Sequence, residues 1–290
     1  MSGIRTSGSF IDGARGRILL LMREPVGPAR GCVLVVPPFA EEMNKCRRMI
    51  TEATLALAAL GVVSVVPDVY GTGDSEGDFA DADWNAWVDD LSLTASWCRS
   101  RAMPVSALLA LRLGSALASE AIRTGAIDGV GQTVLWQPVF DGRRFMVQFM
   151  RQRIAVTQLQ YDKAETMVDI RSRLAAGEIV DVAGYGITEK LVDAIDNLVA
   201  PTAHVGGFGR TAWMELVRDA GRELSAPSAA LVRGLREHGG AIEVMTFTGE
   251  PYWAATEITV NSAVVAATVR ILAGPEVPAG PGGTWQQALQ

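Results

Sequence analysis

The 290-residue sequence has only two histidines and three cysteines, and both shortages limit the metal sites, disulfides and catalytic groups that it can form. The cysteines, Cys32, Cys46 and Cys98, are odd in number and show no C-x-x-C spacing, which argues against a disulfide framework or a zinc site. We therefore expect no metal and no other cofactor. His204 and His238 are the only side chains whose ordinary pKa lies near neutral pH.

Positive charge and long apolar runs are also scarce. The chain has 26 lysines and arginines against 32 aspartates and glutamates, a net charge of -6 and a pI near 5.1. Nucleic-acid-binding domains are normally basic, so nucleic acid is not an expected partner. The apolar stretch 54–66 contains glycine and is too short to span a bilayer. Residues 1–10 lack the apolar core of a secretory signal, and we expect a cytoplasmic protein without a membrane span.

Apolar runs alternate with helical patterns over most of the chain, which predicts an α/β fold with a mostly parallel central sheet flanked by helices. The expected strands are 16–23, 31–37, 62–67, 105–111, 132–138, 202–205 and 241–247, and the expected helices are 43–60, 83–101, 114–118 onward, 228–237 and 258–272. The first two strands are expected to pair through a turn rich in proline and glycine.

The alternation stops between residue 141 and about residue 200, where helical pieces surround a polar middle. We therefore expect a core made of residues 1–140 and 201–273, with a helical cap inserted at 141–200, after the strand at 132–138, which is the sixth strand in the usual numbering of such a fold. The segment 274–290 is rich in proline and glycine and is expected to be a disordered tail.

The segment from Val105 to Ala118 predicts a buried strand, a tight turn and a helix. This is the context of the nucleophile elbow G-x-S-x-G of α/β-hydrolases, in which the serine at the apex attacks the substrate. Ala110 and Gly114 stand at the two glycine positions, and Arg112 stands at the apex. A guanidinium stays protonated and only donates hydrogen bonds, so it cannot attack a carbonyl. The pattern indicates a hydrolase fold without ordinary serine-hydrolase chemistry.

The loop after the strand expected at 31–37 reads Pro-Pro-Phe-Ala-Glu-Glu over residues 37–42. In α/β-hydrolases this loop supplies one backbone N–H of the oxyanion hole, and the residue after the nucleophile supplies another. Because proline has no N–H, Phe39 or Ala40 is the expected first donor and Leu113 the second. The alternative is that Glu41 and Glu42 only begin a helix, whose first turn favours carboxylates.

Four motifs together resemble the exosortase A system-associated hydrolase 2 family. They are Pro-Pro-Phe-Ala-Glu-Glu-Met-Asn at 37–44, D-x-Y-G-x-G-D-S-x-G-D at 68–78, Leu-Arg-Leu-Gly at 111–114 and Gly-Glu-Pro-Tyr-Trp at 249–253. The resemblance runs from about residue 10 to residue 272. It implies an α/β-hydrolase fold in bacteria that make exopolysaccharide and sort proteins through an exosortase. The turn at 68–78 is expected to be structural, because its glycines permit positive φ and its Asp and Ser side chains bond the local backbone.

A Ser-His-Asp triad requires a histidine after the last strand, and this chain has Glu250 and Pro251 there. His238 is expected at a helix end, where the helix dipole favours its cation. His204 is expected as a core histidine in the strand predicted at 202–205, and a catalytic role for it stays open. An unpaired buried arginine is costly, so we expect Arg112 to pair with Glu250, or to bind a charged or sugar-like ligand together with it.

Two other side chains are candidate nucleophiles. Ser115 lies three residues after the apex, where it is expected to pack or to bond the helix backbone. Cys46 has basic neighbours that favour a thiolate, but no matched histidine, and it is expected to be an inert thiol.

Two functions follow from these patterns. The first is a hydrolase or acyltransferase with a non-standard site, acting on an ester, a thioester or an acylated saccharide of exopolysaccharide metabolism. In it, Arg112 would stabilise a carboxylate or a developing oxyanion beside the N–H groups of Phe39, Ala40 and Leu113, and Glu42 or Glu250 would activate water. The alternative is a catalytically inactive homologue that binds a ligand or acts as a scaffold. The expected ligand is a small molecule or an acylated saccharide, and both a partner hydrolase and a homodimer stay open.

Overall fold

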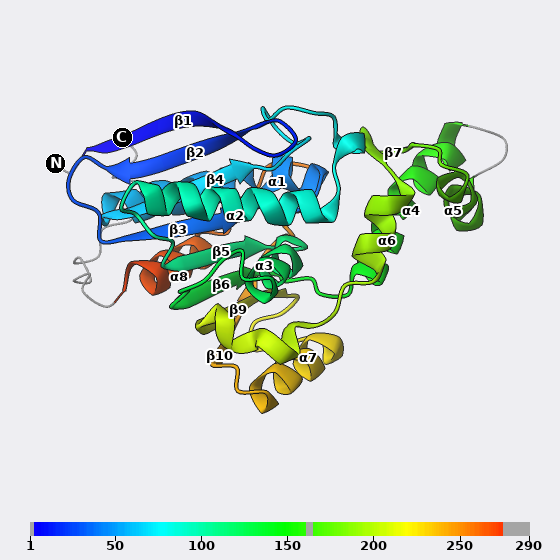
Figure 1. Ribbon diagram of the computed structural model, residues 1–290. Helices are drawn as coiled ribbons and strands as arrows, with labels where there is room; N and C mark the ends of the chain where they lie inside the picture. The colour runs from blue at the N-terminus through cyan, green and yellow to red at the C-terminus, as the bar shows by residue number, and fades with distance from the viewer. Residues whose placement is uncertain (1–2, 161–164, 275–290) are drawn as a thin grey trace.

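The computed structural model describes residues 3–160 and 165–274, and this part of the chain is built around one eight-stranded sheet (Figure 1). The strand order is β1-β2-β4-β3-β5-β6-β9-β10. Strand β2 is antiparallel to both β1 and β4, and every later neighbour pairs in parallel. The predicted mostly parallel sheet is therefore confirmed.

The bounds of the elements follow the chain. The strands are β1 Ile4–Asp12, β2 Arg17–Pro25, β3 Gly31–Val36, β4 Val62–Asp68, β5 Ala107–Leu111, β6 Gln132–Trp136, β7 Val180–Val182, β8 Tyr185–Ile187, β9 Arg210–Val217 and β10 Ile242–Thr248. The helices are α1 Glu41–Ala59, α2 Trp84–Ser100, α3 Gly114–Arg123, α4 Gly142–Gln160, α5 Met167–Ala175, α6 Glu189–Asp196, α7 Ala226–Glu237 and α8 Ser262–Ala273, with short 3-10 helices η1 Phe79–Asp81 and η2 Pro201–Phe208.

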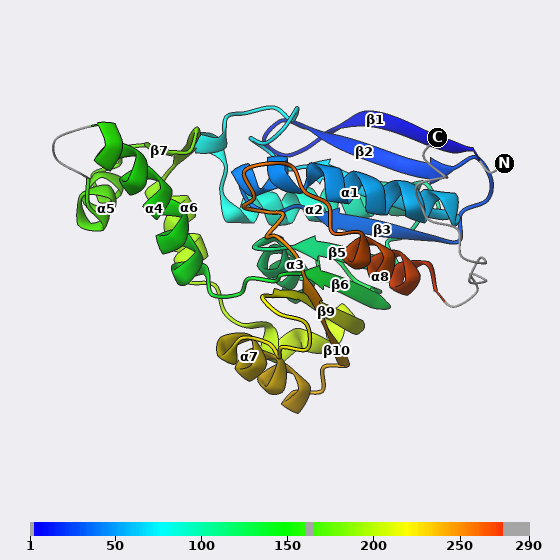
Figure 2. The same ribbon diagram turned by 180° about the vertical axis from the view of Figure 1, so that it is seen from behind.

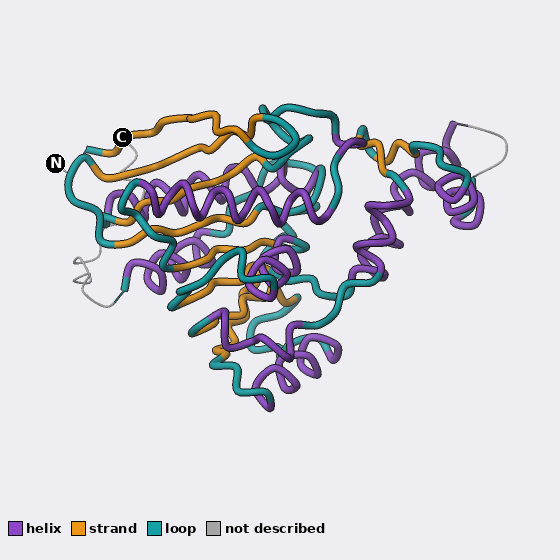
Figure 3. The backbone as a smooth tube through the Cα atoms, in the orientation of Figure 1, coloured by secondary structure: helices purple, strands orange, loops and turns teal. Residues whose placement is uncertain are grey.

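Helices cover both faces of the sheet, which explains why the central strands are continuous apolar runs. Helices α2 and α3 lie on the face turned to the viewer in Figure 1, and α1 and α8 lie on the opposite face, seen in Figure 2. Strands β4 and β5 are buried at every position. Figure 3 shows the strands as one layer between these helices. No helix in the described part of the chain is long and apolar enough to cross a membrane.

Two expectations for the strands were wrong, and two strands of the large sheet were not predicted. The strands predicted at 16–23 and 31–37 do not pair, because β4 lies between β2 and β3. The strand predicted at 202–205 is part of the 3-10 helix η2, which begins at Pro201. The seventh strand of the large sheet is β9, eight residues further on, and edge strand β1 was not predicted.

Helices α4, α5 and α6 and the hairpin of β7 and β8 form an inserted segment, Gly142–Asp196, beside the sheet (Figures 1 and 2). Its two ends lie against each other: a Cβ added to Gly142 would lie 1.8 Å from the backbone oxygen of Ile195. Only glycine fits this contact between the first residue of α4 and the last turn of α6. The segment thus leaves the core and returns to it at nearly one place.

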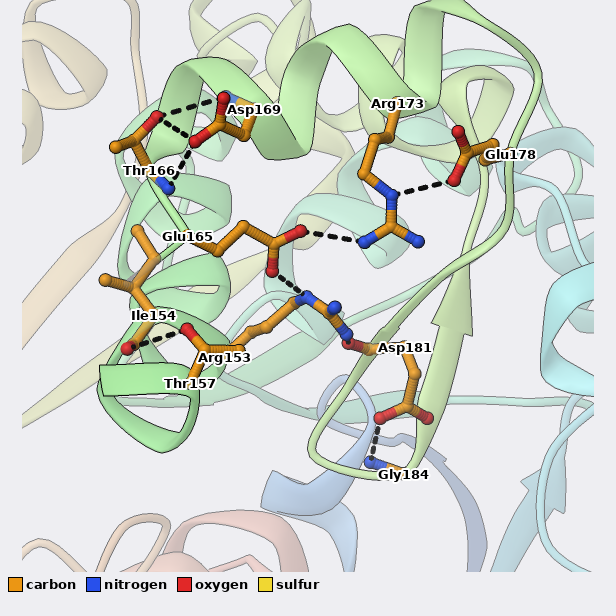
Figure 4. A network of polar contacts seen from close by, with 10 residues as sticks. All are labelled: Arg153, Ile154, Thr157, Glu165, Thr166, Asp169, Arg173, Glu178, Asp181 and Gly184. Atoms are coloured by element: carbon orange, nitrogen blue, oxygen red, sulfur yellow. Dashed lines mark hydrogen bonds and ion pairs between the residues drawn. The ribbon is translucent and has the colours of Figure 1, made fainter. Parts of the chain in front are cut away.

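Ion pairs connect the outer elements of the inserted segment (Figure 4). The carboxylate of Glu165 accepts hydrogen bonds from Arg153 of α4 and from Arg173 of α5, the latter over 2.7 Å. Arg173 also donates to Glu178 over 2.7 Å, and Arg153 donates to the backbone oxygen of Asp181 over 2.7 Å. A shared network of this kind orders two arginines with one carboxylate and joins α4, α5 and β7.

The predicted tail beyond Gly274 lies outside the described residues.

Candidate functional site

The turn between β5 and α3 has the geometry of a nucleophile elbow, built around an arginine. Arg112 has a φ of 52°, in the left-handed region that non-glycine residues seldom adopt. Gly114 packs directly on the chain after β3, where an added Cβ would lie 2.3 Å from the backbone oxygen of Pro37. The hydrogen bond from the Arg112 N–H to the backbone oxygen of Trp136 spans 3.0 Å and ties the turn to β6. The apex is therefore sharp and fixed, as the sequence pattern predicts.

The side chain of Arg112 is engaged on several sides. Its Nε donates to Glu42 Oε1 over 3.0 Å, and its Nη2 lies 2.9 Å from the same oxygen. Nη1 donates to the backbone oxygen of Gln137 over 3.2 Å, and Cζ lies 4.6 Å from the centre of the Trp253 ring. The carboxylate and the aromatic face both stabilise the cation. Arg112 is thus a held, partly buried charge.

The expected pairing of Arg112 with Glu250 was wrong. Glu250 is exposed in the loop after β10, and the carboxylate that bonds Arg112 is that of Glu42, in the first turn of α1. Tyr252 and Trp253 follow directly in the same loop. Tyr252 is 2% exposed and packs edge-on against Trp136, with ring centres 5.9 Å apart. Aromatic packing therefore anchors the loop that carries Glu250 and Pro251, where a triad histidine would stand.

Glu42 is a buried carboxyl group with an unusual affinity for protons. Burial raises its pKa to about 7, although the charge and the hydrogen bonds of Arg112 act in the opposite direction. Its second oxygen, Oε2, is buried and has no hydrogen-bond partner in the described part of the chain. A carboxyl group that exchanges its proton near neutral pH has the property required of a general acid or base.

The candidate nucleophiles are inaccessible. Ser115 is 0% exposed, and its Oγ has no hydrogen-bond partner among the described residues. Cys46 is also 0% exposed, and burial raises the pKa of its thiol well above the ordinary value. A thiol held protonated is a poor nucleophile.

His204 bonds a different serine. Its Nε2 lies 2.8 Å from the Oγ of Ser119, which is 3% exposed on α3. Burial lowers the pKa of His204, so the imidazole is held in its neutral form. Ser119 and His204 line neither of the hollows that flank Arg112, and their contact packs η2 against α3. His238 lies at the end of α7, where its Nδ1 is 2.8 Å from the backbone oxygen of Gly234.

The first hollow lies at the expected oxyanion-hole loop, and we call it the aromatic cavity. It measures about 240 Å³, and the residues with the three expected backbone donors, Phe39, Ala40 and Leu113, all line it. No hydrogen bond from their N–H groups to another described residue exists in the structure. Two helices, α1 and α3, begin beside these groups, so their N-terminal dipoles add to the attraction for a partly negative oxygen.

Aromatic rings form the remaining wall of this cavity. Phe39 meets Phe79 and Trp87 edge to face, at centre distances of 5.4 and 5.9 Å, and these rings line the space together with Trp84. The inserted segment contributes Tyr185, whose ring centre is 5.0 Å from that of Phe79. The cavity thus combines unpaired N–H donors with a large apolar surface.

The second hollow lies beside Arg112 itself, and we call it the polar groove. It measures about 610 Å³ and lies among the loop after β6, α4, the end of β9 and the start of α7. Its polar lining consists of Arg112, Gln137, Asp141, Arg144, Gln148, Glu215, Ser225 and Ser228. Phe145 lines this groove and packs against Phe39 of the aromatic cavity, with ring centres 5.6 Å apart. The two hollows are therefore neighbours.

Glu215 was not predicted as a site residue, although it lies near the end of the strand that precedes the acid in a triad. It is 6% exposed, and its carboxylate accepts hydrogen bonds from Trp213 Nε1 over 3.2 Å and from the Ser225 N–H over 3.3 Å. The sequence did indicate Glu215 as a candidate, because it is an acidic residue within an apolar run, but strand β9 itself was not predicted. The carboxylate now stabilises the loop before α7.

Comparison with solved structures identifies the fold. Est1E from Butyrivibrio proteoclasticus with ferulic acid bound has a TM-score of 0.63 and 12% identity, covering 91% of this chain and 97% of that one. A hyperthermophilic esterase from Pyrobaculum calidifontis has a TM-score of 0.59 and 17% identity, covering 93% of this chain and 86% of that one. A carboxyl esterase from Bacillus coagulans in complex with glycerol has a TM-score of 0.55 and 13% identity, covering 86% of this chain and 91% of that one.

These likenesses show that the chain has the α/β-hydrolase fold, as the sequence predicts. No protein-family model and no curated protein matches the chain. The resemblance to the exosortase A system-associated hydrolase 2 family and the cytoplasmic location stay predictions.

Proposed function

We propose that this α/β-hydrolase-fold protein binds an acylated saccharide in the two hollows beside Arg112 and does not form an acyl-enzyme with it. The observation that carries the proposal is the elbow arginine itself. It is bonded to Glu42, stacked on Trp253 and lines the polar groove, and the next residue, Leu113, lines the aromatic cavity. A held cation beside such hollows suits recognition better than nucleophilic attack.

The aromatic cavity suits the acyl half of such a ligand. Its rings offer apolar surface to an aryl or short alkyl chain, and each buried methylene contributes about 0.8 kcal/mol. The unpaired N–H groups of Phe39, Ala40 and Leu113 would donate hydrogen bonds to the carbonyl oxygen. Est1E, which shares the fold, holds ferulic acid, an aryl carboxylic acid. That ligand is of the size and chemistry proposed here.

The polar groove suits the saccharide half. Arg144 and Gln148, on the exposed side of α4, offer donors, and Ser225 and Ser228 offer hydroxyl groups at the start of α7. Sugar hydroxyls need such paired donors and acceptors at close range. The resemblance to the exosortase-associated family supplies the setting, in which the ligand is an acylated component of exopolysaccharide metabolism.

Hydrolysis or acyl transfer without a covalent intermediate is the second candidate, and one observation favours it. The pKa of Glu42 is near 7, and its Oε2 is unpaired. Water or an acceptor hydroxyl would attack the acyl carbon as Glu42 takes its proton, and Glu42 would return that proton to the leaving oxygen or sulfur as the acyl bond breaks, while Arg112 and the backbone donors stabilise the oxyanion. Glu42 is 8% exposed and lines neither hollow, so its carboxyl group would have to turn toward one of them. The substrate would be an ester, a thioester or an acylated saccharide.

Binding is tested by the quenching of tryptophan fluorescence, since Trp84 and Trp87 line the aromatic cavity. The probes are a methyl 6-O-feruloyl glucoside, ferulic acid and methyl glucoside. The feruloyl glucoside is expected to bind more tightly than either part. Phe79→Ala is expected to weaken binding of ferulic acid and the ester, and Arg144→Gln to weaken binding of the ester alone. Arg143→Gln, an exposed neighbour outside the groove, is the matched control. Absence of quenching by all three probes would contradict the proposal.

Turnover separates the two candidates. Nitrophenyl acyl esters and acyl thioesters are incubated with the native protein, with Arg112→Ala and with Glu42→Gln, after thermal unfolding has shown that each variant is folded. None of the three proteins is expected to release nitrophenol or free thiol faster than buffer alone. Release that is lost in the folded Glu42→Gln variant would overturn the binding proposal in favour of hydrolysis.

A further inference from the structure

A groove at the opposite end of the strands from Arg112 is lined by arginines that the proposed function does not use. It measures about 870 Å³ and lies at the N-terminal ends of β6, β9 and β10, whereas Arg112 follows the C-terminal end of β5. Figures 1 and 2 show α8 and these strand ends on the side away from the inserted segment. We call it the basic groove. Its charged lining consists of Arg210, Arg236, Arg270 and Glu243.

These three arginines lack carboxylate partners. No salt bridge within the described residues includes Arg210, Arg236 or Arg270, although many other arginines of the chain are paired. They come from three separate elements, the start of β9 and the last turns of α7 and α8. In a chain with a net charge of -6, a groove with three unpaired guanidinium groups and one carboxylate is a local reversal of charge.

The backbone holds one of the three in place. Arg236 Nε and Nη2 both donate to the backbone oxygen of Ile242, over 3.1 and 2.8 Å. Its Nη1 has no partner among the residues that the structure describes. The guanidinium is therefore oriented before any ligand arrives, which lowers the entropy lost on binding.

Arg270 lies in the last turn of α8, where the helix dipole favours a cation, but among the described residues it bonds none of the last carbonyl groups. Gln132 Nε2 donates to the backbone oxygen of Leu272 over 3.4 Å, and Arg30 Nη2 donates to that of Ala273 over 3.4 Å. Arg270 itself is exposed at the groove.

We infer that the basic groove binds a sugar-like ligand with two or more oxyanion groups. Guanidinium groups match phosphate and carboxylate oxygens through paired N–H donors. The described lining includes no aromatic side chain on which a nucleobase would stack. Glu243 and Gln132 offer acceptors for hydroxyl groups beside the arginines. The ligand class is therefore a phosphorylated or a carboxylated sugar.

The inference is tested by titration calorimetry with the full chain at low and at high salt. Inorganic pyrophosphate represents the phosphorylated ligand and trigalacturonate the carboxylated one, so the stronger binder identifies the source of the charge. Arg210→Gln and Arg270→Gln are each expected to weaken binding about three- to fivefold, and the double variant about tenfold or more. Higher salt is expected to weaken binding, because the Debye length shortens to about 3 Å at 1 M.

Arg233→Gln is the matched control, since Arg233 is exposed on α7 outside the groove. Equal loss of affinity in this control, or absence of binding by both probes at low salt, would overturn the inference. Competition by a mixed-sequence single-stranded RNA that displaces both probes would also overturn it in favour of a nucleic-acid surface. The substituted side chains are exposed, so the variants are expected to keep the thermal stability of the native protein.

Discussion

Replacing Glu42 by glutamine should change how the stability of the protein depends on pH. The folded chain holds the Glu42 proton up to about pH 7, whereas the unfolded chain releases it near the ordinary pKa of 4.5. Between these values the folded state binds more protons than the unfolded state. The free energy of unfolding of the native protein therefore falls as the pH rises through this interval, and it levels off above pH 7.

The size of the effect follows from the shift. One pKa unit corresponds to about 1.4 kcal/mol, so the Glu42 contribution should fall by about 3 kcal/mol between pH 4.5 and pH 7. The desolvation of the carboxylate outweighs its attraction to Arg112, as is common for buried ion pairs. Glutamine keeps the shape of the side chain but does not titrate. The Glu42→Gln variant should lack this part of the slope.

Urea unfolding followed by circular dichroism at pH 5, 6, 7 and 8 measures the effect. The difference in unfolding free energy between the variant and the native protein should move by about 3 kcal/mol in favour of the variant from pH 5 to pH 8. Glu52→Gln, which removes another carboxylate from the same helix, is the control substitution. Parallel curves for the native protein and Glu42→Gln would refute the reasoning, because Glu42 would then ionise in the folded state as it does in the unfolded one.

Two further substitutions test the packing around the site. Gly73→Ala should destabilise the protein by about 2 kcal/mol or more, because Gly73 has a φ of +56° and an added Cβ would lie 1.9 Å from Asp68 Oδ2. Gly125→Ala, with a φ of +74° and open space around it, should cost only about 1 kcal/mol; equal losses in urea unfolding would contradict the steric argument. Ser119→Ala should cost about 1 kcal/mol through the loss of the 2.8 Å bond to His204, with no change in ligand affinity. A loss of affinity would place this pair in the binding site.

Much of the sheet could be predicted from the sequence because its central strands are buried on both faces and read as uninterrupted apolar runs. Strand β9 escaped this pattern because it begins with Arg210 and contains Glu215. The apolar residues just before it resembled a strand, but Pro201 begins a 3-10 helix there. Edge strand β1 was missed for a related reason, since its exposed, polar sequence carries little apolar signal.

In the candidate site, the residues set by local sequence could be predicted, and those brought together by distant contacts could not. The elbow at Arg112 and the donors at Phe39, Ala40 and Leu113 follow from short motifs beside strand ends, and the structure brings them together. The partner of Arg112 could not be found in this way. Glu42 lies seventy residues away along the chain, and only the packing of α1 beside the elbow brings the two side chains into contact.

The contact between Gly142 and Ile195 has a consequence for how this protein could have evolved. Because the two ends of the inserted segment touch, these more than fifty residues connect to the core across a gap no wider than a single tight turn. Such a segment can be lengthened at its outer elements without moving a strand, since its junction is already the width of a short loop. Its deletion would instead uncover Phe39, against which Phe145 and Phe149 of α4 pack. The wall that Tyr185 adds to the aromatic cavity would change with it. An exchange of this segment has two junctions in the sequence, near Gly142 and Ile195, which lie at one place in the structure, and it leaves the elbow and its arginine in place.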